Sequence, residues 1–197
     1  MVIKKPLVLA SGSARRQQLL RQIGLEYRVI ESGIDETFDD KKSVKENVEV
    51  VAYEKARSVG EKLQNGIIIG ADTVVVLGDH ILGKPKSFDE AVAMLTKLSG
   101  HTHLVYTGFC LYDRPSNKSI TTHDITKVTF RKLAQEEIIE YVKAGSPMDK
   151  AGAYGIQDDY GAVFVERIEG CYYNVVGFPL AKFYLVMQQF QQQLGLL

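Results

Sequence analysis

The sequence predicts an α/β fold, with a mixed sheet inside one domain spanning residues 1–197. Short apolar runs that are typical of buried strands alternate with stretches of helical periodicity, which favours βα units and parallel pairing. Strand–turn–strand patterns interrupt this alternation, and they favour antiparallel hairpins. No repeat, linker or low-complexity segment divides the chain.

The first third of the chain reads as two strand-to-helix units. Leu7–Ala10 is a short apolar run, the Ser-Gly-Ser turn at 11–13 ends it, and a helical pattern then continues to Gly24. Residues 27–30 suggest a second strand. Ser43 and Glu46 have the spacing of a capping box, which predicts a helix from there to about Gln64.

The middle of the chain combines a hairpin with a helix. An apolar strand at 67–77 is expected to be interrupted at Asp72–Thr73, and Gly78–Asp79 predicts a turn into a short strand at 81–82. Ser87 and Glu90 form a second capping-box pattern, which predicts a helix that ends at Gly100.

The last part of the chain continues with strands near 103–113 and 119–131, separated by a turn at 114–117. A helix is expected at 135–143, followed by a glycine-rich loop. The segments 162–165 and 172–176 are rich in β-branched and aromatic residues and read as strands. Pro179 can begin a final amphipathic helix.

Composition narrows the function. Lys plus Arg and Asp plus Glu both number 24, which disfavours binding to a nucleic-acid backbone but leaves room for a small anionic ligand. The two cysteines, Cys110 and Cys171, provide neither a disulfide framework nor zinc-ligand spacing. No apolar segment approaches the roughly 20 residues of a membrane span and no export signal is visible, so a cytoplasmic location without membrane partners is expected.

The segment Ser11–Arg16 is a candidate phosphate site. Backbone amides and serine hydroxyls at a helix N-terminus favour an anion, and the forked donors of Arg15 and Arg16 suit phosphate. An ordinary helix cap with two solvated arginines would have the same pattern.

Asp72 is the most informative residue, because it places a carboxylate inside an otherwise apolar strand. A buried carboxylate needs a cation, a metal or solvent, although a simple turn at this point would also explain the residue. Lys84 follows across the proposed hairpin. Asp35–Glu36, matched against Lys55, offers hard oxygen ligands for Mg²⁺ or Mn²⁺, or is simply solvated.

The loop 150–157 is rich in glycine and ends in Gln157. Glycines permit a ligand to approach the backbone closely, and the Gln157 amide could match the imide edge of uracil or thymine. A purely structural loop is the alternative. His101 and His103 lack a third metal ligand and are expected to be surface residues.

Taken together, these segments resemble the Maf family from about residue 7 to 183. The order and spacing of the motifs carry the resemblance: LASGSARR at 9–16, GADTVV at 70–75, LGKP at 82–85, LSG at 98–100, MDKAGAYGIQ at 148–157 and VVGFPL at 175–180. The resemblance implies an extended, curved mixed sheet with two lobes and a central cleft. It also implies hydrolysis of nucleoside triphosphates between the α and β phosphates, with a divalent metal.

The ending at Gln157 resembles the branch that acts on dTTP and UTP, and the family's site residues carry over by position. Asp72 falls on the proton-accepting carboxylate. The positions that determine base specificity correspond to Arg15, Thr73 and Gln157. The positions that hold phosphates or the metal correspond to Ser13, Arg16, Lys55, Lys84 and Glu36, together with Asp72 for the metal.

Three departures from the family pattern are visible. Ala14 replaces a usual proline, Phe178 replaces a commoner leucine, and Asp158–Asp159–Tyr160 replaces a smaller stretch after Gln157. Two alternatives stay open: a pyrophosphatase directed at purine triphosphates, and a nucleotide-binding regulator of septum formation without turnover. The family often dimerises, so a homodimer is a further expectation of the resemblance.

Overall fold

The computed structural model describes residues 2–145, 147–157 and 160–197 of the chain. The described chain divides into two compact units. The first consists of residues up to Asp72 together with Thr107–Asp124 and Gly177–Leu197, and the second consists of Thr73–Tyr106 and Ile125–Val176. The long strands β3 (Gly66–Leu77), β5 (Thr102–Arg114) and β6 (Ser119–Phe130) each continue from one unit into the other.

The sheet is mixed, as the sequence predicted. Its strand order is β2-β1-β3-β5-β6-β7, with β4 paired to β3. In the first unit β1 is parallel to both β2 and β3, whereas in the second unit β4 and β7 pair antiparallel with β3 and β6. The remaining strands are β1 (Leu7–Leu9), β2 (Arg28–Val29), β4 (His80–Leu82) and β7 (Val165–Glu169). The α/β class is therefore confirmed, while the central cleft stays a prediction.

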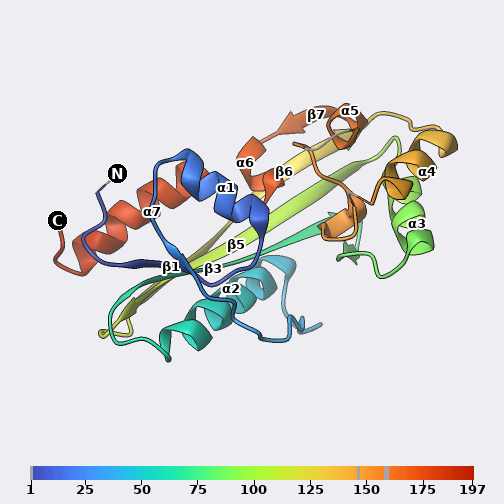
Figure 1. The fold of residues 1–197 in the computed structure, drawn as a ribbon. Coiled ribbons are helices and arrows are strands. Elements are labelled where there is room, and N and C mark those ends of the chain that lie inside the picture. The colour runs from blue at the N-terminus through green and yellow to red at the C-terminus, as the bar shows by residue number, and fades with distance from the viewer. Residues whose placement is uncertain (1, 146, 158–159) are drawn as a thin grey trace. The chain divides into compact units, whose positions relative to one another are not determined.

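In the first unit, helices cover both faces of the strands (Figure 1). Helix α2 (Val44–Gly60) packs on one face through small residues and valines, including Ala52, Ala56 and Val59. On the other face Phe109 of β5 contacts Phe178 and Phe183, with ring centroids 5.5 and 6.1 Å away. This second face is covered by α1 (Ala14–Gln22) and α7 (Leu180–Gln193).

The close approach of α2 depends on two glycines in the strands. A Cβ at Gly70 would lie 2.1 Å from the Ala52 carbonyl oxygen, and a Cβ at Gly108 would lie 2.4 Å from the Val48 carbonyl oxygen. Neither position can therefore hold a side chain without moving the helix away from the sheet.

The second unit contains α3, α4, the 3₁₀ turn η1 and the short helices α5 and α6. Helix α3 contacts both α4 and η1. The buried rings of Phe130, Tyr141, Tyr154 and Phe164 pack together beside these elements. The bounds are α3 Phe88–Leu98, α4 Gln135–Lys143, η1 Ala151–Ala153, α5 Gly161–Phe164 and α6 Tyr172–Val176.

Several local predictions are confirmed. The Ser43–Glu46 capping box opens α2, with the Ser43 backbone N–H donating to Glu46 Oε2 over 2.8 Å. The turn at Gly78–Asp79 connects β3 to β4. The second box forms only in part: Ser87 Oγ accepts from the Glu90 N–H, but the Glu90 carboxylate accepts from Lys86 instead of Ser87.

Three predictions are wrong. Strand β3 runs through Asp72–Thr73 without a break. Residues 172–176 form a helix because Asn174 donates from its buried amide to the Val105 carbonyl and to Thr126, contacts distant in sequence that outweigh local propensity. Residues 161–164 are likewise helical, and β7 begins only at Val165.

We expect Gly70→Ala to lower the free energy of unfolding by about 2–3 kcal/mol, because the new methyl group overpacks the contact with the α2 backbone. For a chain of this size the melting temperature should fall by about 5–10 °C. Gly83→Ala is the matched control, since a Cβ there meets nothing within 4 Å. Calorimetric melting of both variants checks this, and an unchanged Gly70→Ala transition would contradict the packing argument.

Candidate active site

The loop after β1 ends at the N-terminus of α1 and is tied together by serines. Ser13 is the cap residue, and its Oγ accepts from the Arg16 backbone N–H over 3.4 Å. Ser11 Oγ accepts from the Ser13 N–H over 3.3 Å. The helix N-terminus expected in the segment Ser11–Arg16 is therefore present, and Arg15 and Arg16 occupy the first turn of the helix.

Arg16 is buried, and protein acceptors hold its guanidinium. Its Nη1 donates to Ser11 Oγ over 3.1 Å and its Nε donates to the Gly177 carbonyl over 3.1 Å. Burial lowers the pKa of Arg16; the carboxylates of Asp72 and Glu36 oppose this shift, and the neighbouring charge of Arg15 adds to it. Arg16 therefore interacts electrostatically with the carboxylates of both Asp72 and Glu36.

Lys55 is the centre of the charged cluster. Its Nζ lies 2.9 Å from Asp72 Oδ1 and 2.7 Å from Glu36 Oε1, and it also donates to the Ala71 carbonyl over 3.2 Å. The side chains of Lys55 and Asp72 are each 6% exposed, whereas Glu36 is 44% exposed. Asp72 therefore has the cation that its place in an apolar strand requires.

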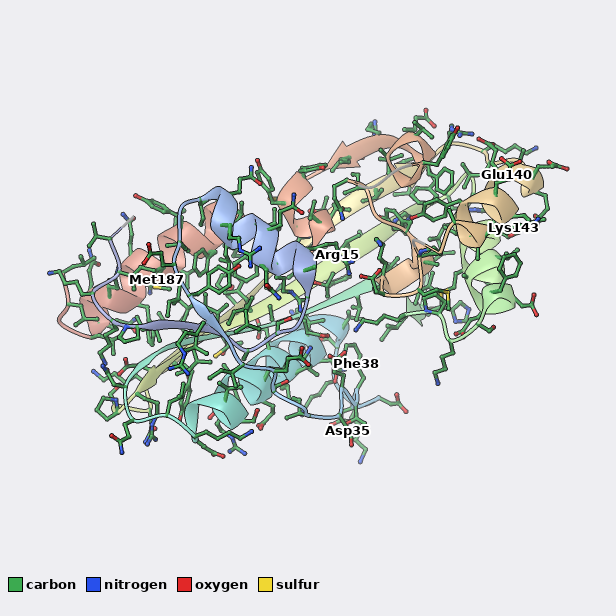
Figure 2. All side chains as sticks on the ribbon, in the orientation of Figure 1. Arg15, Asp35, Phe38, Glu140, Lys143 and Met187 are labelled. Carbon is green, nitrogen blue, oxygen red and sulfur yellow. The ribbon has the colours of Figure 1, made fainter. Side chains whose placement is uncertain are left out.

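The loop that carries Glu36 is held by Asn47, a residue that the sequence analysis did not single out. Asn47 Oδ1 accepts from the Asp39 N–H over 2.8 Å, and its Nδ2 donates to the Asp39 and Lys42 carbonyls. Asn47 is 4% exposed. Its position one residue before Val48, on the buried face of α2, was the available signal. In Figure 2, Arg15 lies at the start of α1, and Asp35 and Phe38 lie in the loop before α2.

Three of the predicted residues belong to the second unit. Thr73 is partly buried on β3, and Lys84 is exposed just after β4. The glycine-rich loop lies against the same hairpin, because the Gly152 N–H donates to the Gly83 carbonyl over 3.0 Å and Gly152 packs against Val75. Gly152 has a φ of 69°, which favours glycine.

Gln157 ends this loop with an unsatisfied amide. Its Oε1 and Nε2 are both buried, and neither has a hydrogen-bond partner among the described residues. Leaving a buried amide without partners costs about 1–3 kcal/mol. Of the departing stretch Asp158–Asp159–Tyr160 after this loop, Asp158 and Asp159 lie outside the described residues.

The predicted site residues therefore fall into two groups, each described within its own unit. Ser13, Arg15, Arg16, Glu36, Lys55 and Asp72 belong to the first unit, and Thr73, Lys84 and Gln157 belong to the second. Within the first group, contacts or charge interactions join Asp72, Glu36, Lys55 and both arginines.

The carboxylates of Asp72 and Glu36 are suitable for a divalent cation. Both bind the same ammonium, so their oxygens are no farther apart than the sum of the two distances to Lys55 Nζ. Magnesium is commonly held by one or two carboxylates and by substrate phosphates. Among the described residues, no group of three or more His, Cys, Asp or Glu side chains is arranged to hold a metal ion.

A separate pocket of about 550 Å³ lies beside α4 in the second unit. Its described lining contains none of the predicted site residues. It is formed by Glu137, Glu140, Tyr141, Ala144, Tyr160 and Val163.

His103 contradicts its prediction as a surface residue. It is 1% exposed, and its Nε2 lies 2.8 Å from the Tyr154 hydroxyl. Its place in the alternation of β5, where Val105 is also buried, put it on an inward face. His101 is exposed, as predicted.

Comparison with known proteins decides the family. The family model described as Maf-like protein matches residues 6–190. The chain belongs to the Maf family. The segments with predicted site residues at Ser11–Arg16, Asp72 and Gln157 all lie within the matched range.

Curated relatives of this Maf chain are named dTTP/UTP pyrophosphatase. The relative from Acetivibrio thermocellus is 49% identical over 93% of this chain and 94% of its own length. Those from Aquifex aeolicus and Clostridium botulinum are 48% and 50% identical, over 93% and 90% of this chain and 94% and 93% of their own lengths. The solved Ham1 protein of Staphylococcus aureus has a TM-score of 0.44 at 17% identity, covering 64% of this chain and 72% of that one.

No helix formed by the described residues of this Maf chain combines the length and the apolar character that a membrane crossing requires.

We expect Lys55→Met to lower the free energy of unfolding by about 3–5 kcal/mol, because it leaves the buried Asp72 carboxylate without its ammonium partner. Adding Asp72→Asn should restore a large part of that loss, since the uncompensated charge is then removed. Denaturant titration of the single and double variants measures both effects.

Lys42→Met provides the control, because the Lys42–Asp39 pair is 44% and 45% exposed and should contribute less than about 1 kcal/mol. Equal losses for Lys42→Met and Lys55→Met would show that the buried cluster has no special role in stability.

Proposed function

We propose that this protein hydrolyses dTTP and UTP to the nucleoside monophosphate and pyrophosphate, using Mg²⁺ or Mn²⁺. One observation carries the proposal: the buried Lys55 and Asp72 form a charged cluster with the exposed Glu36. Arg16 interacts electrostatically with both carboxylates of this cluster. The names of relatives that are nearly half identical over most of their length support the same activity. Removal of unwanted nucleotides, including modified pyrimidine nucleotides, is the cellular role we propose.

The proposed reaction is in-line attack of water on the α-phosphorus. A new bond forms between the water oxygen and the α-phosphorus, the bond from the α-phosphorus to the bridging oxygen breaks, and pyrophosphate leaves. Lys55 occupies Asp72 Oδ1, so we assign Oδ2 to accept the proton of the attacking water. A bound divalent cation, held by Glu36 and Asp72, would supply positive charge against the reacting phosphates.

The cations have separate proposed roles. Arg16 and Ser13 at the α1 N-terminus hold the phosphates and stabilise the charge that develops on the leaving group. Lys55 is assigned to the same phosphates, and a phosphate oxygen would have to replace one of the three oxygens that its Nζ contacts. Arg16 needs no rearrangement to hold a phosphate, because Ser11 and Gly177 already hold it in place. Lys84, exposed after β4, is assigned to the same phosphates.

Base recognition is assigned to Gln157, with Arg15 and Thr73 contributing. The unsatisfied buried amide supports this role, because uracil and thymine present an N–H donor beside carbonyl acceptors. A homodimer and a cytoplasmic location stay predictions from the sequence.

The activity is tested by measuring pyrophosphate release from dTTP, UTP, ITP, GTP and 7-methyl-GTP, with Mg²⁺, Mn²⁺ or a chelator present. Monophosphate and pyrophosphate, formed fastest from dTTP and UTP and only with metal, are the expected result. Faster turnover of ITP would favour the purine-directed alternative. Tight triphosphate binding without any product would favour a regulator that lacks turnover.

Asp72→Asn should lower kcat by at least about 100-fold, since it removes the proposed proton acceptor. The amide keeps the shape of the side chain, so circular dichroism should be unchanged. Glu49→Gln is a control, because Glu49 contacts His123 and has no proposed part in the reaction. A folded Asp72→Asn enzyme with near-normal kcat would remove Asp72 from the mechanism.

Gln157→Ala should narrow the ratio of kcat/KM between UTP and GTP by about 10-fold, the effect of losing one or two hydrogen bonds to the base. Steady-state kinetics with both nucleotides measures this ratio. If the ratio does not change, the base is recognised elsewhere.

A further inference from the structure

The residues just before Gln157 rest on a buried cluster that we call the aromatic anchor: His103, Phe130, Tyr141, Tyr154 and Phe164. All five side chains are at most 5% exposed. The Tyr154 ring lies 4.7 Å from Phe130 and 5.4 Å from His103, and the Tyr141 ring lies 5.0 Å from Phe164, with edge-to-face geometry in each case. These contacts connect the glycine-rich loop to β5, β6, α4 and α5 within the second unit.

Two hydrogen bonds connect the loop to this anchor. The Tyr154 hydroxyl lies 2.8 Å from His103 Nε2, and the Gly155 backbone N–H donates to the Tyr141 hydroxyl over 3.2 Å. Tyr154 and Gly155 are the third and second residues before Gln157. Both bonds are buried, so water does not compete for them.

The loop is also confined by close backbone contacts. A Cβ at Gly161 would lie 2.3 Å from the Gly155 carbonyl oxygen and 3.1 Å from the Tyr141 hydroxyl. At its other end, Gly152 donates to the Gly83 carbonyl. Residues 152–155 are thus fixed at both ends, and Gln157 follows two residues later.

The polar groups of the anchor are costly for a core that needs only packing. Burial lowers the pKa of His103 to about 4 and raises the pKa of Tyr154, so both side chains are neutral near pH 7. His103 Nδ1 is buried without a hydrogen-bond partner among the described residues. Phenylalanine at 141 and 154 would fill the same space, but it would leave the Gly155 N–H and His103 Nε2 buried and unpaired. The hydrogen bonds of the two tyrosines are directional, so they specify one arrangement of the loop.

We propose that His103, Tyr141 and Tyr154 are positioning residues that fix the Gln157 amide and thereby set the preference for uracil and thymine over purines. This inference rests on the proposed function, since it assigns base recognition to Gln157. None of the three side chains needs to touch the nucleotide. Their effect on the reaction passes through the loop that ends at Gln157.

The test uses Tyr154→Phe and Tyr141→Phe, which remove one hydroxyl each and keep the ring. The ratio of kcat/KM for UTP to that for GTP should fall about 3- to 10-fold in each variant, the effect of one hydrogen bond. The fall should come from UTP, with kcat/KM for GTP within about 2-fold of the parent protein. A general loss of folding would lower both nucleotides together.

Tyr112→Phe is the matched control. Tyr112 is also 5% exposed, and its hydroxyl donates to Asn117 Oδ1 over 2.9 Å, but it belongs to the first unit and not to the anchor. Its UTP-to-GTP ratio should be unchanged. Amide hydrogen exchange provides a readout that is independent of turnover, because Gly155 should exchange faster in Tyr141→Phe.

The same ratio is measured as binding affinity by calorimetry, which separates this inference from the proposed function. If the parent protein binds UTP over GTP without turnover, the proposed hydrolysis fails, but the binding ratio still tests the anchor. Unchanged ratios in both anchor variants, or a parent protein without any preference for UTP, would overturn the inference.

Discussion

The organisation of the first unit depends on one buried ammonium. Lys55 compensates Asp72 inside an apolar strand and also holds Glu36 on the neighbouring loop. It reaches both only because α2 lies almost in backbone contact with β3, which the missing side chain at Gly70 allows. Helix packing and the arrangement of charge are therefore one constraint, and a change that moves α2 outward would separate the charges as well.

The same unit also holds a second buried cation, Arg16, in a fixed position. Arg16 is held by Ser11 and by the carbonyl of Gly177, where the chain returns to this unit before α7. Because the Arg16 guanidinium is already desolvated and positioned, the phosphate contact proposed for it would require little reorganisation. In the second unit, the amide of Gln157 is buried and has no hydrogen-bond partner among the described residues. Such local violations of packing rules concentrate at functional sites.

Much of the fold followed from periodicity. The α/β class, the mixed sheet, the β3–β4 hairpin and the Ser43 capping box were all predictable, because they depend on patterns within a few neighbouring residues. The failures have a common cause in distant contacts. Residues 172–176 have strand propensity, but the hydrogen bonds of Asn174 to Val105 and Thr126 hold them as a helix. His103 was predicted to be a surface residue, but it is buried with a hydrogen-bond partner, Tyr154, that lies fifty-one positions away in the sequence.

The family and the candidate residues could be predicted from the sequence, since the order of short motifs is a one-dimensional property and Asp72 is anomalous in its own strand. The sequence could suggest Lys55 as a partner for the acidic residues. That one Nζ contacts Asp72 and Glu36 together became visible only in three dimensions, because it depends on how closely a helix approaches a sheet. The hydrogen-bond partners of Asn47 and of the aromatic anchor likewise came only from the structure, since the hydrogen bonds of a buried side chain are set by what surrounds it in space.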